Sequence, residues 1–262
     1  MRSRSGAQLT LHDGIVHKLH RPGTDPRALT ARLRAAAAVD ELLTPISGTP
    51  ERIGERWRTR WPYVETLAPE PESVTWPDIA RLLARLHLAA FEHRLPVHGW
   101  PARLRRAVAL ARGNATVVRA AAGLPTQTWR GGSAGRPHTL VHGDFHLGQV
   151  ARRGSDDDWC LIDIDDLGVG DPAWDLARPA GFWAVGLIPD ADWTAFVDAY
   201  RAAGGPALPP GDPWPVLEPF ARAAVIQAAA NHPDDDMLLT ACAQMPQLPQ
   251  LEKKSRPKPC LR

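Results

Sequence analysis

Apolar and polar residues alternate along two short runs near the N-terminus. The runs are AQLTL and IVHKLH, and the turn dipeptide Asp13-Gly14 lies between them. Because two-residue turns of this type join antiparallel strands, the pattern predicts a β-hairpin over residues 7–20. The run RWRTRWPYVE at residues 56–65 also alternates, and it predicts a further strand.

Two later segments carry apolar residues at helical spacing, each behind a proline that suits a first helical turn. The first begins at Pro26, with Thr24 or Asp25 available as its cap, and predicts a helix of about four turns. The second begins at Pro77. Their apolar stripes are Leu29, Leu33 and Ala36 in the first segment, and Ile79, Leu82, Leu83 and Leu86 in the second. We also expect one Arg- and Ala-rich helix over residues 101–123, and helices separated by Pro/Gly loops from residue 183 to about residue 245.

The composition changes at the Pro-rich, acidic segment ETLAPEPES, from mixed and β-rich before it to mostly helical after it. This change predicts a linker between two lobes. We therefore expect an N-terminal lobe over residues 1–67, built from a small sheet and one helix, and a larger helical lobe over residues 68–245. The polar, Pro-containing residues 246–262 read as a disordered tail.

Charge, cysteine content and hydropathy exclude several functional classes. The 31 Lys and Arg nearly balance the 29 Asp and Glu, and a net charge of +2 gives no reason to expect a nucleic-acid or membrane partner. The three cysteines include no CxxC pair, which fits a reducing compartment better than a disulfide framework. Since no apolar run of about 18 residues occurs, we expect a soluble, cytoplasmic protein.

Residues with the chemistry of a phosphotransferase lie between residues 140 and 177. In TLVHGDFHLGQV a short apolar strand precedes Asp144, and Gln149 follows one short loop later. In WCLIDIDDLGVGDPAWDLA a second strand ends at Asp163. The intervening residues suffice for a loop, a strand, a turn at 154–156 and a return strand. We therefore expect both aspartates at the ends of neighbouring strands, facing one cleft.

Phosphoryl transfer requires one carboxylate that orients or deprotonates the acceptor hydroxyl, and oxygen ligands that hold Mg²⁺ on the phosphates. Asp144 suits the base, and Gln149 and Asp163 suit the magnesium ligands. A metal-dependent hydrolase that uses His142, Asp144 and His146 is the rival interpretation. We expect both histidines to shape the loop through hydrogen bonds instead.

Four further aspartates near these motifs have simpler expected roles. Asp171 precedes Pro172 and can cap a helix there, while Asp175 lies one turn inside that helix and is expected to be structural. Asp165 and Asp166 are expected to be solvated acids, although either could approach a cationic acceptor.

The two segments resemble the aminoglycoside phosphotransferase and choline kinase superfamily, whose usual patterns are HGDxHxxN and IDxxxxxxGDPxxDLA. The second pattern matches at every fixed position, which are Ile162, Asp163, Gly170, Asp171, Pro172, Asp175, Leu176 and Ala177. The first differs at Gln149, where the family usually has Asn. The HLGQ ending is similar to that of maltokinase-like members.

The resemblance implies an α+β, two-lobed protein-kinase-like fold with a reduced N-terminal β lobe, a larger, mainly helical C-terminal lobe and an active site between them. It implies ATP or GTP and Mg²⁺ as cofactors, and a small hydroxylated molecule as acceptor. An aminoglycoside or other sugar-containing antibiotic is the first expectation, which would make the chain a resistance enzyme, and a sugar or amino alcohol is the next. Lys18 would contact the nucleotide phosphates, and backbone groups from Glu65 to Leu67 would contact adenine.

Two features depart from the family pattern. The helix after Lys18 carries only Asp40 and Glu41, near its far end, where a kinase usually has a glutamate that pairs with the lysine. Only MRSRSG precedes the first predicted strand, so we expect the Gly-rich phosphate-covering loop to be absent, or the start of the chain to be misplaced. These departures keep a pseudokinase open as an alternative, one that binds nucleotide or a partner without turnover.

Overall fold

The computed structural model describes residues 6–67, 76–91, 94–154 and 158–245. The predicted tail at residues 246–262 lies outside the described residues, as do the predicted linker beyond residue 67 and most of the predicted turn at 154–156.

The N-terminal sheet has four antiparallel strands in the order β1-β2-β4-β3. The strands are β1 (Gln8–His12), β2 (Ile15–Leu19), β3 (Glu51–Ile53) and β4 (Arg56–Pro62). Asp13 and Gly14 join β1 to β2 with φ angles of 49° and 72°, which a type I′ turn requires. The predicted hairpin is confirmed. Strand β3 was not predicted, because three residues are too few to show an alternation and the strand depends on its pairing with β4.

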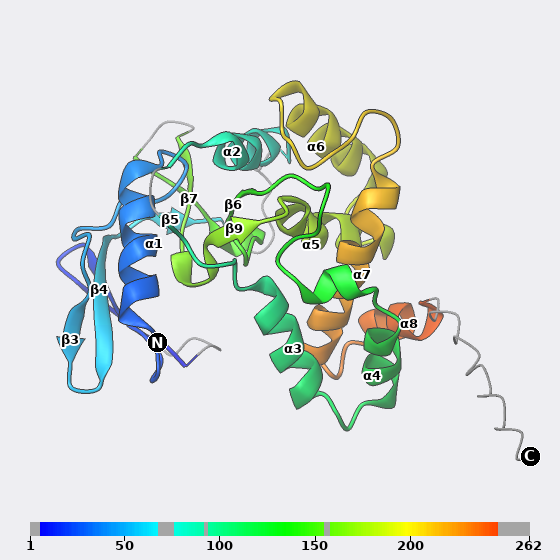
Figure 1. Cartoon of the computed structure of the whole chain (residues 1–262), viewed down its shortest axis with the longest axis horizontal. Coiled ribbons are helices and arrows are strands. Elements are labelled where there is room, and N and C mark those ends of the chain that lie inside the picture. The colour runs from blue at the N-terminus through cyan, green and yellow to red at the C-terminus, as the bar shows by residue number, and fades with distance from the viewer. Residues whose placement is uncertain (1–5, 68–75, 92–93, 155–157, 246–262) are drawn as a thin grey trace, which may run out of the picture.

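Helix α1 (Pro26–Ala38) follows the hairpin, and of the two possible caps Asp25 is the one used, because its side chain accepts a hydrogen bond from the Arg27 N–H. In Figure 1, α1 and the N-terminal sheet form one side of the molecule, and helices α3 to α8 form the other. The chain after α1 runs beside the strand Trp159–Leu161, because the Leu161 N–H donates to Glu41 O and the Leu43 N–H donates to Leu161 O. These bonds hold the N-terminal sheet close to the loop that begins at Asp163.

Two small antiparallel sheets lie between these sides. One contains β5 (Glu65–Thr66), β7 (Val150–Arg152) and β8 (Trp159–Leu161) in the order β5-β7-β8, and the other pairs β6 (Thr139–Val141) with β9 (Gly168–Gly170). Asp144 follows β6 and Asp163 follows β8, so the expectation that they end neighbouring strands is wrong. The chain after Asp163 returns as β9, and β9 pairs with β6 while β8 pairs with β7.

The second part of the chain is mainly helical. Its helices are α2 (Trp76–Leu88), α3 (Trp100–Leu110), α4 (Ala115–Ala122), α5 (Ala173–Ala184), α6 (Asp190–Ala202), α7 (Trp214–Asn231) and α8 (Asp236–Gln244). The single helix predicted over residues 101–123 is in fact α3 and α4. The break occurs because Gly113 interrupts the run and the Asn114 side chain caps a new helix by accepting from Thr116 and Val117 N–H groups.

Aromatic side chains fill the core between α3, α5 and α7. Trp174 is fully buried, with its ring centroid 5.4 Å from that of Trp100 and 4.9 Å from that of Phe220. The described residues thus form an α+β fold, a β-sheet followed by a mainly helical part, as expected. The lobe boundary at residue 67 stays a prediction. Among the described helices, none has the length and apolar character needed to cross a membrane.

Candidate active site

The loop that follows β6 carries Asp144, and a buried carboxylate holds this loop from beneath. Asp175, in the first turn of α5, accepts hydrogen bonds from His142 N–H at 2.6 Å and from Gly143 N–H at 2.9 Å. Its third partner is His87 Nε2 at 3.1 Å. Burial opposes ionisation of this carboxyl, but these hydrogen bonds hold the pKa of Asp175 below its usual value. The predicted structural role of Asp175 is confirmed.

The hydrogen bonds of Asp175 continue into α2 and α6. His87 Nδ1 lies 2.7 Å from the Tyr200 hydroxyl, and that hydroxyl oxygen accepts from Ala207 N–H at 3.2 Å. With Nε2–H donating to Asp175 and Nδ1 accepting from Tyr200, His87 satisfies every member of the chain. The loop that carries Asp144 is therefore connected to the helical core through a continuous set of buried hydrogen bonds.

Both ring nitrogens of His142 are engaged within the protein. Nε2 lies 2.8 Å from Ile162 O, and Nδ1 lies 3.4 Å from Asp144 N. The expectation that His142 shapes the loop is confirmed, and the hydrolase interpretation loses one of its three ligands. Burial lowers the pKa of His146 to about 3, so His146 is neutral at physiological pH. Among the described residues, no group of three or more His, Cys, Asp or Glu side chains is arranged to hold a metal.

Gly143 allows the loop to approach the segment after β8. Its φ of 79° lies in the left-handed region, and a Cβ at this position would overlap the Asp166 carbonyl oxygen. The close approach brings Asp166 beside Asp144, and Arg103 bridges the two carboxylates at 2.8 Å from Asp144 and 2.9 Å from Asp166.

Residue Asp144 is only 7% exposed, and the charge state of its carboxyl reflects two opposing effects. Burial disfavours the carboxylate, whereas Arg103 and the more distant Arg178, 3.7 Å away, favour it. Burial is the larger effect and raises the pKa of Asp144 to about 6. A carboxylate with this pKa is largely ionised at neutral pH and still basic enough to accept a proton.

The two expected magnesium ligands are close neighbours across the β7-β8 hairpin. The backbone carbonyl oxygen of Gln149 accepts a hydrogen bond from the Ile162 N–H at 2.9 Å, and Asp163 is the residue after Ile162. Asp163 has φ 63° and ψ 77°, a left-handed conformation that is uncommon for residues other than glycine and is concentrated at functional sites. One carboxylate and one amide oxygen suit Mg²⁺, which takes the rest of its oxygen ligands from phosphates and water. The donor set fits the ion.

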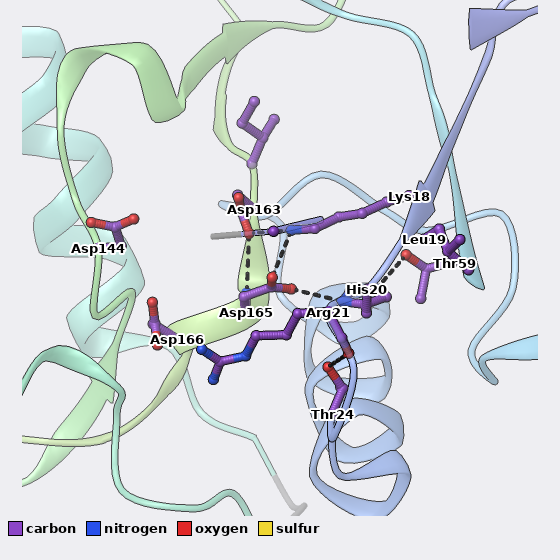
Figure 2. A network of polar contacts seen from close by, with 12 residues as sticks. Lys18, Leu19, His20, Arg21, Thr24, Thr59, Asp144, Asp163, Asp165 and Asp166 are labelled. Atoms are coloured by element: carbon purple, nitrogen blue, oxygen red, sulfur yellow. Dashed lines mark hydrogen bonds and ion pairs between the residues drawn. The ribbon is translucent and has the colours of Figure 1, made fainter. Parts of the chain in front are cut away.

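Lys18 reaches from β2 to this loop, as Figure 2 shows. Its Nζ lies 2.6 Å from Asp163 Oδ1 and 2.9 Å from Asp165 Oδ2. Burial alone would lower the pKa of Lys18, but the two carboxylates outweigh burial and raise it. The structure therefore brings the expected phosphate-binding lysine to an expected metal ligand, although the two residues are far apart in the sequence.

Asp165 also binds His20, whose Nδ1 lies 3.2 Å from Asp165 Oδ1. The other His20 nitrogen lies 2.9 Å from Thr59 Oγ1 (Figure 2). The expectation that Asp165 and Asp166 are solvated acids is wrong, because Lys18 and His20 hold Asp165 and Arg103 holds Asp166. Sequence reasoning missed His20, and the only signal was its position two residues after Lys18 on an alternating strand.

Asp40 and Glu41, expected near the far end of helix α1, lie beyond its last residue, Ala38, and both are engaged elsewhere. Glu41 pairs with Arg85 at 3.2 Å, and the Asp40 carbonyl oxygen accepts from Arg153. The poor supply of acids on this helix was expected. Asp163 and Asp165 take the place of the missing glutamate, so Lys18 is held by the loop after β8 rather than by the helix.

The segment expected to contact adenine includes β5, the edge strand of the sheet β5-β7-β8. Glu65 pairs with Arg152 and Thr66 with Ala151, and Leu67 N–H donates to Val150 O at 3.0 Å. Hydrogen bonding alternates along an antiparallel pair, so Thr66 directs its N–H and C=O away from β7. Of the three residues, Thr66 therefore has the backbone groups that remain available to a ligand.

Comparisons with known proteins agree with this geometry. A sequence model described as "Phosphotransferase enzyme family" matches residues 18–217. No curated protein sequence matches the chain significantly.

Several solved structures are similar in fold. An aminoglycoside phosphotransferase from Streptomyces rimosus, in complex with ADP and streptomycin, has a TM-score of 0.57 at 18% identity, over 86% of this chain and 89% of that chain. A choline kinase from Streptococcus pneumoniae has a TM-score of 0.56 at 14% identity, over 93% and 89%. A choline/ethanolamine kinase family protein from Mesorhizobium loti has a TM-score of 0.54 at 16% identity, over 90% and 81%.

Proposed function

The chain belongs to the phosphotransferase enzyme family, and from this membership we propose that it transfers the γ-phosphoryl group of ATP or GTP to a hydroxyl of a small molecule. Its structural relatives are small-molecule kinases, and two of them were crystallised with ADP. In the proposed reaction Asp144 is the base, Gln149 and Asp163 bind Mg²⁺, and Lys18 contacts the phosphates.

The contact between Lys18 and Asp163 is the observation that carries this proposal. A phosphate chain bound as a magnesium complex needs a cation from one side and an oxygen ligand for the metal from the other. Lys18 Nζ and Asp163 Oδ1 are 2.6 Å apart and come from β2 and from the loop after β8. A nucleoside triphosphate bound here as its magnesium complex would contact the Lys18 ammonium and the Asp163 carboxylate at once. When bound, Mg²⁺ neutralises the charge that develops on the phosphates.

Asp144 lies on the loop after β6, apart from the Lys18 contacts (Figure 2). It would accept the proton of the acceptor hydroxyl as the hydroxyl oxygen attacks the γ-phosphorus and the nucleoside diphosphate leaves. Its pKa of about 6 supports this role, because the carboxylate is ionised at neutral pH without assistance.

Gln149 and the residues around Thr66 have supporting roles in the proposal. Gln149 would present an amide oxygen to the metal in place of the asparagine that is usual in the family, as in the maltokinase-like HLGQ ending. Backbone groups between Glu65 and Leu67, those of Thr66 in particular, would contact adenine, since the Leu67 N–H already donates to Val150.

The acceptor is proposed to be a small hydroxylated molecule in the cytoplasm, not a nucleic acid or a membrane. Resemblance alone favours an aminoglycoside or other sugar-containing antibiotic, and then a sugar or amino alcohol. Spectinomycin and streptomycin are bound in two structurally similar phosphotransferases. An acceptor panel should therefore contain members of each class.

The test measures release of nucleoside diphosphate by the full chain with ATP or GTP, Mg²⁺ and this panel. Asp144→Asn should abolish turnover and leave the nucleotide Kd within about twofold of wild type, whereas Asp163→Asn should weaken binding of the magnesium nucleotide as well. The exposed Asp198 on α6 supplies a matched control, Asp198→Asn. Nucleotide binding without turnover on any acceptor would identify a pseudokinase instead.

A further inference from the structure

Two arginines from different helices converge on the carboxylate that is proposed as the base. Arg103, on α3, lies 2.8 Å from Asp144 Oδ2, and Arg178, on α5, lies 3.7 Å from Asp144 Oδ1. Their side chains are 25% and 22% exposed, so both are largely buried but reachable from solvent. An acceptor hydroxyl must come within hydrogen-bond distance of Asp144, and the rest of the acceptor would therefore lie beside these guanidinium groups.

Both arginines have hydrogen-bonding capacity that the described residues leave unused. The Nε–H groups of Arg103 and Arg178 are buried, and neither has a hydrogen-bond partner among the described residues. The 3.7 Å separation of Arg178 from Asp144 is too long for a hydrogen bond. Arg178 also lies 5.6 Å from the ring centroid of Trp100, which orients its guanidinium without satisfying its donors. A carboxylate or phosphate would accept these donors in pairs.

The acids near Asp144 are already paired, so they offer little to a cationic acceptor. Asp166 binds Arg103 at 2.9 Å, and Asp165 binds Lys18 and His20. An acceptor ammonium next to Asp144 would meet two guanidinium groups, while Asp165 and Asp166 are already engaged by other cations. Like charges brought together in this way select against a partner.

We propose that the acceptor carries an anionic group, a carboxylate or a phosphate, which Arg103 and Arg178 bind while the reacting hydroxyl lies on Asp144. This inference rests on the proposed phosphoryl transfer and narrows its acceptor class. It disfavours aminoglycosides and amino alcohols as acceptors, because they carry positive charge, and it favours hydroxy acids and sugar phosphates.

The experiment compares hydroxylated probes that differ mainly in charge. The probes are glucose (neutral), glucosamine and kanamycin (cationic), gluconate (carboxylate) and glucose 6-phosphate (phosphate). Each is assayed as an acceptor with magnesium ATP, and its binding to the full chain is measured separately by calorimetry with magnesium ADP present. The two anionic probes distinguish carboxylate from phosphate recognition, and inorganic phosphate tests the arginine pair alone.

Variants of Arg178 report on the same site. Arg178→Gln should raise the KM and the Kd of the anionic probes by roughly 10- to 100-fold, and it should leave the Kd of ATP within about twofold because Lys18 remains. Arg178→Lys keeps the charge and should recover part of the affinity. The exposed Arg119 on α4 provides the control Arg119→Gln, which should change none of these constants.

The outcomes separate this inference from the proposed function. Anion binding that depends on Arg178 without any turnover would refute the transferase proposal and retain the anion site. Preferred transfer to glucosamine or kanamycin would overturn the inference and retain the transferase. Failure of gluconate, glucose 6-phosphate and inorganic phosphate all to bind would also overturn it. So would a loss of ATP affinity in Arg178→Gln with unchanged acceptor binding, since the arginine would then serve the nucleotide.

Discussion

Replacing Asp175, the buried carboxylate that binds the loop carrying Asp144, should reduce stability far more than an ordinary surface substitution. Asp175→Asn keeps the shape of the side chain but removes its charge and exchanges one accepting oxygen for a donating NH₂ group. In the wild type one oxygen accepts from Gly143 N–H, and the other accepts from His142 N–H and His87 Nε2. Whichever way the amide turns, at least one backbone N–H must face another donor.

The magnitude follows from these contacts. A buried donor left without an acceptor costs about 1–3 kcal/mol, and the remaining hydrogen bonds weaken because the acceptor is no longer ionised. The free energy of unfolding should therefore fall by about 3–5 kcal/mol. For a chain of this size, each kcal/mol corresponds to roughly 2–4 °C in Tm, so Tm should fall by about 6–20 °C.

Thermal unfolding followed by circular dichroism measures this change, with urea unfolding as a second estimate. Asp198→Asn serves as the control, because Asp198 is exposed on α6 and a surface substitution there should stay within about 0.5 kcal/mol of wild type. Turnover of folded Asp175→Asn should also fall, since the loop carrying Asp144 loses its support. A Tm within about 2 °C of wild type would refute the view that this carboxylate holds the loop.

Three further predictions concern other members of the site. Since the pKa of Asp144 is raised to about 6, kcat/KM for transfer should increase with pH through about 6 as the carboxyl loses its proton, and a flat profile between about pH 5 and pH 8 would contradict its role as base. Asp165→Asn removes a charge that faces Lys18 and should raise the KM for ATP by roughly tenfold in steady-state assays, with little change in kcat; the reverse pattern would argue against a positioning role. Tyr200→Phe deprives His87 of a donor at 2.7 Å and should lower the free energy of unfolding in urea by about 1–3 kcal/mol, whereas an unchanged midpoint would show that this bond contributes nothing.

Elements whose signals are local were predictable from the sequence. The turn at Asp13-Gly14 and the cap at Asp25 each depend on a few adjacent residues, and both are present. The prediction of one helix over residues 101–123 was wrong because Asn114 caps a new helix there, against the helical tendency of its neighbours. Strand β3 was not predicted because its signal is not local: its three residues form a strand only when they pair with β4.

The candidate site also contains residues that the sequence identified and partners that it did not. The motif spacing singled out Asp144, Gln149 and Asp163 as residues with the chemistry of phosphoryl transfer, and the family resemblance added Lys18. It did not find the partners that determine their charge states. Arg103 and Arg178 lie in arginine-containing helices whose sequence has no feature that distinguishes them from solvated arginines.

The sequence by itself determined the reaction class and the local elements, because motif chemistry and hydrogen bonds between near neighbours are written in adjacent residues. Tertiary structure decided which charges meet. Lys18 joins Asp163 and Asp165, Asp175 joins the loop of Asp144, and two arginines adjoin the proposed base, in each case across long stretches of chain. Coulomb energies and desolvation depend on distance and burial in the folded molecule, so only the fold indicates an anionic acceptor.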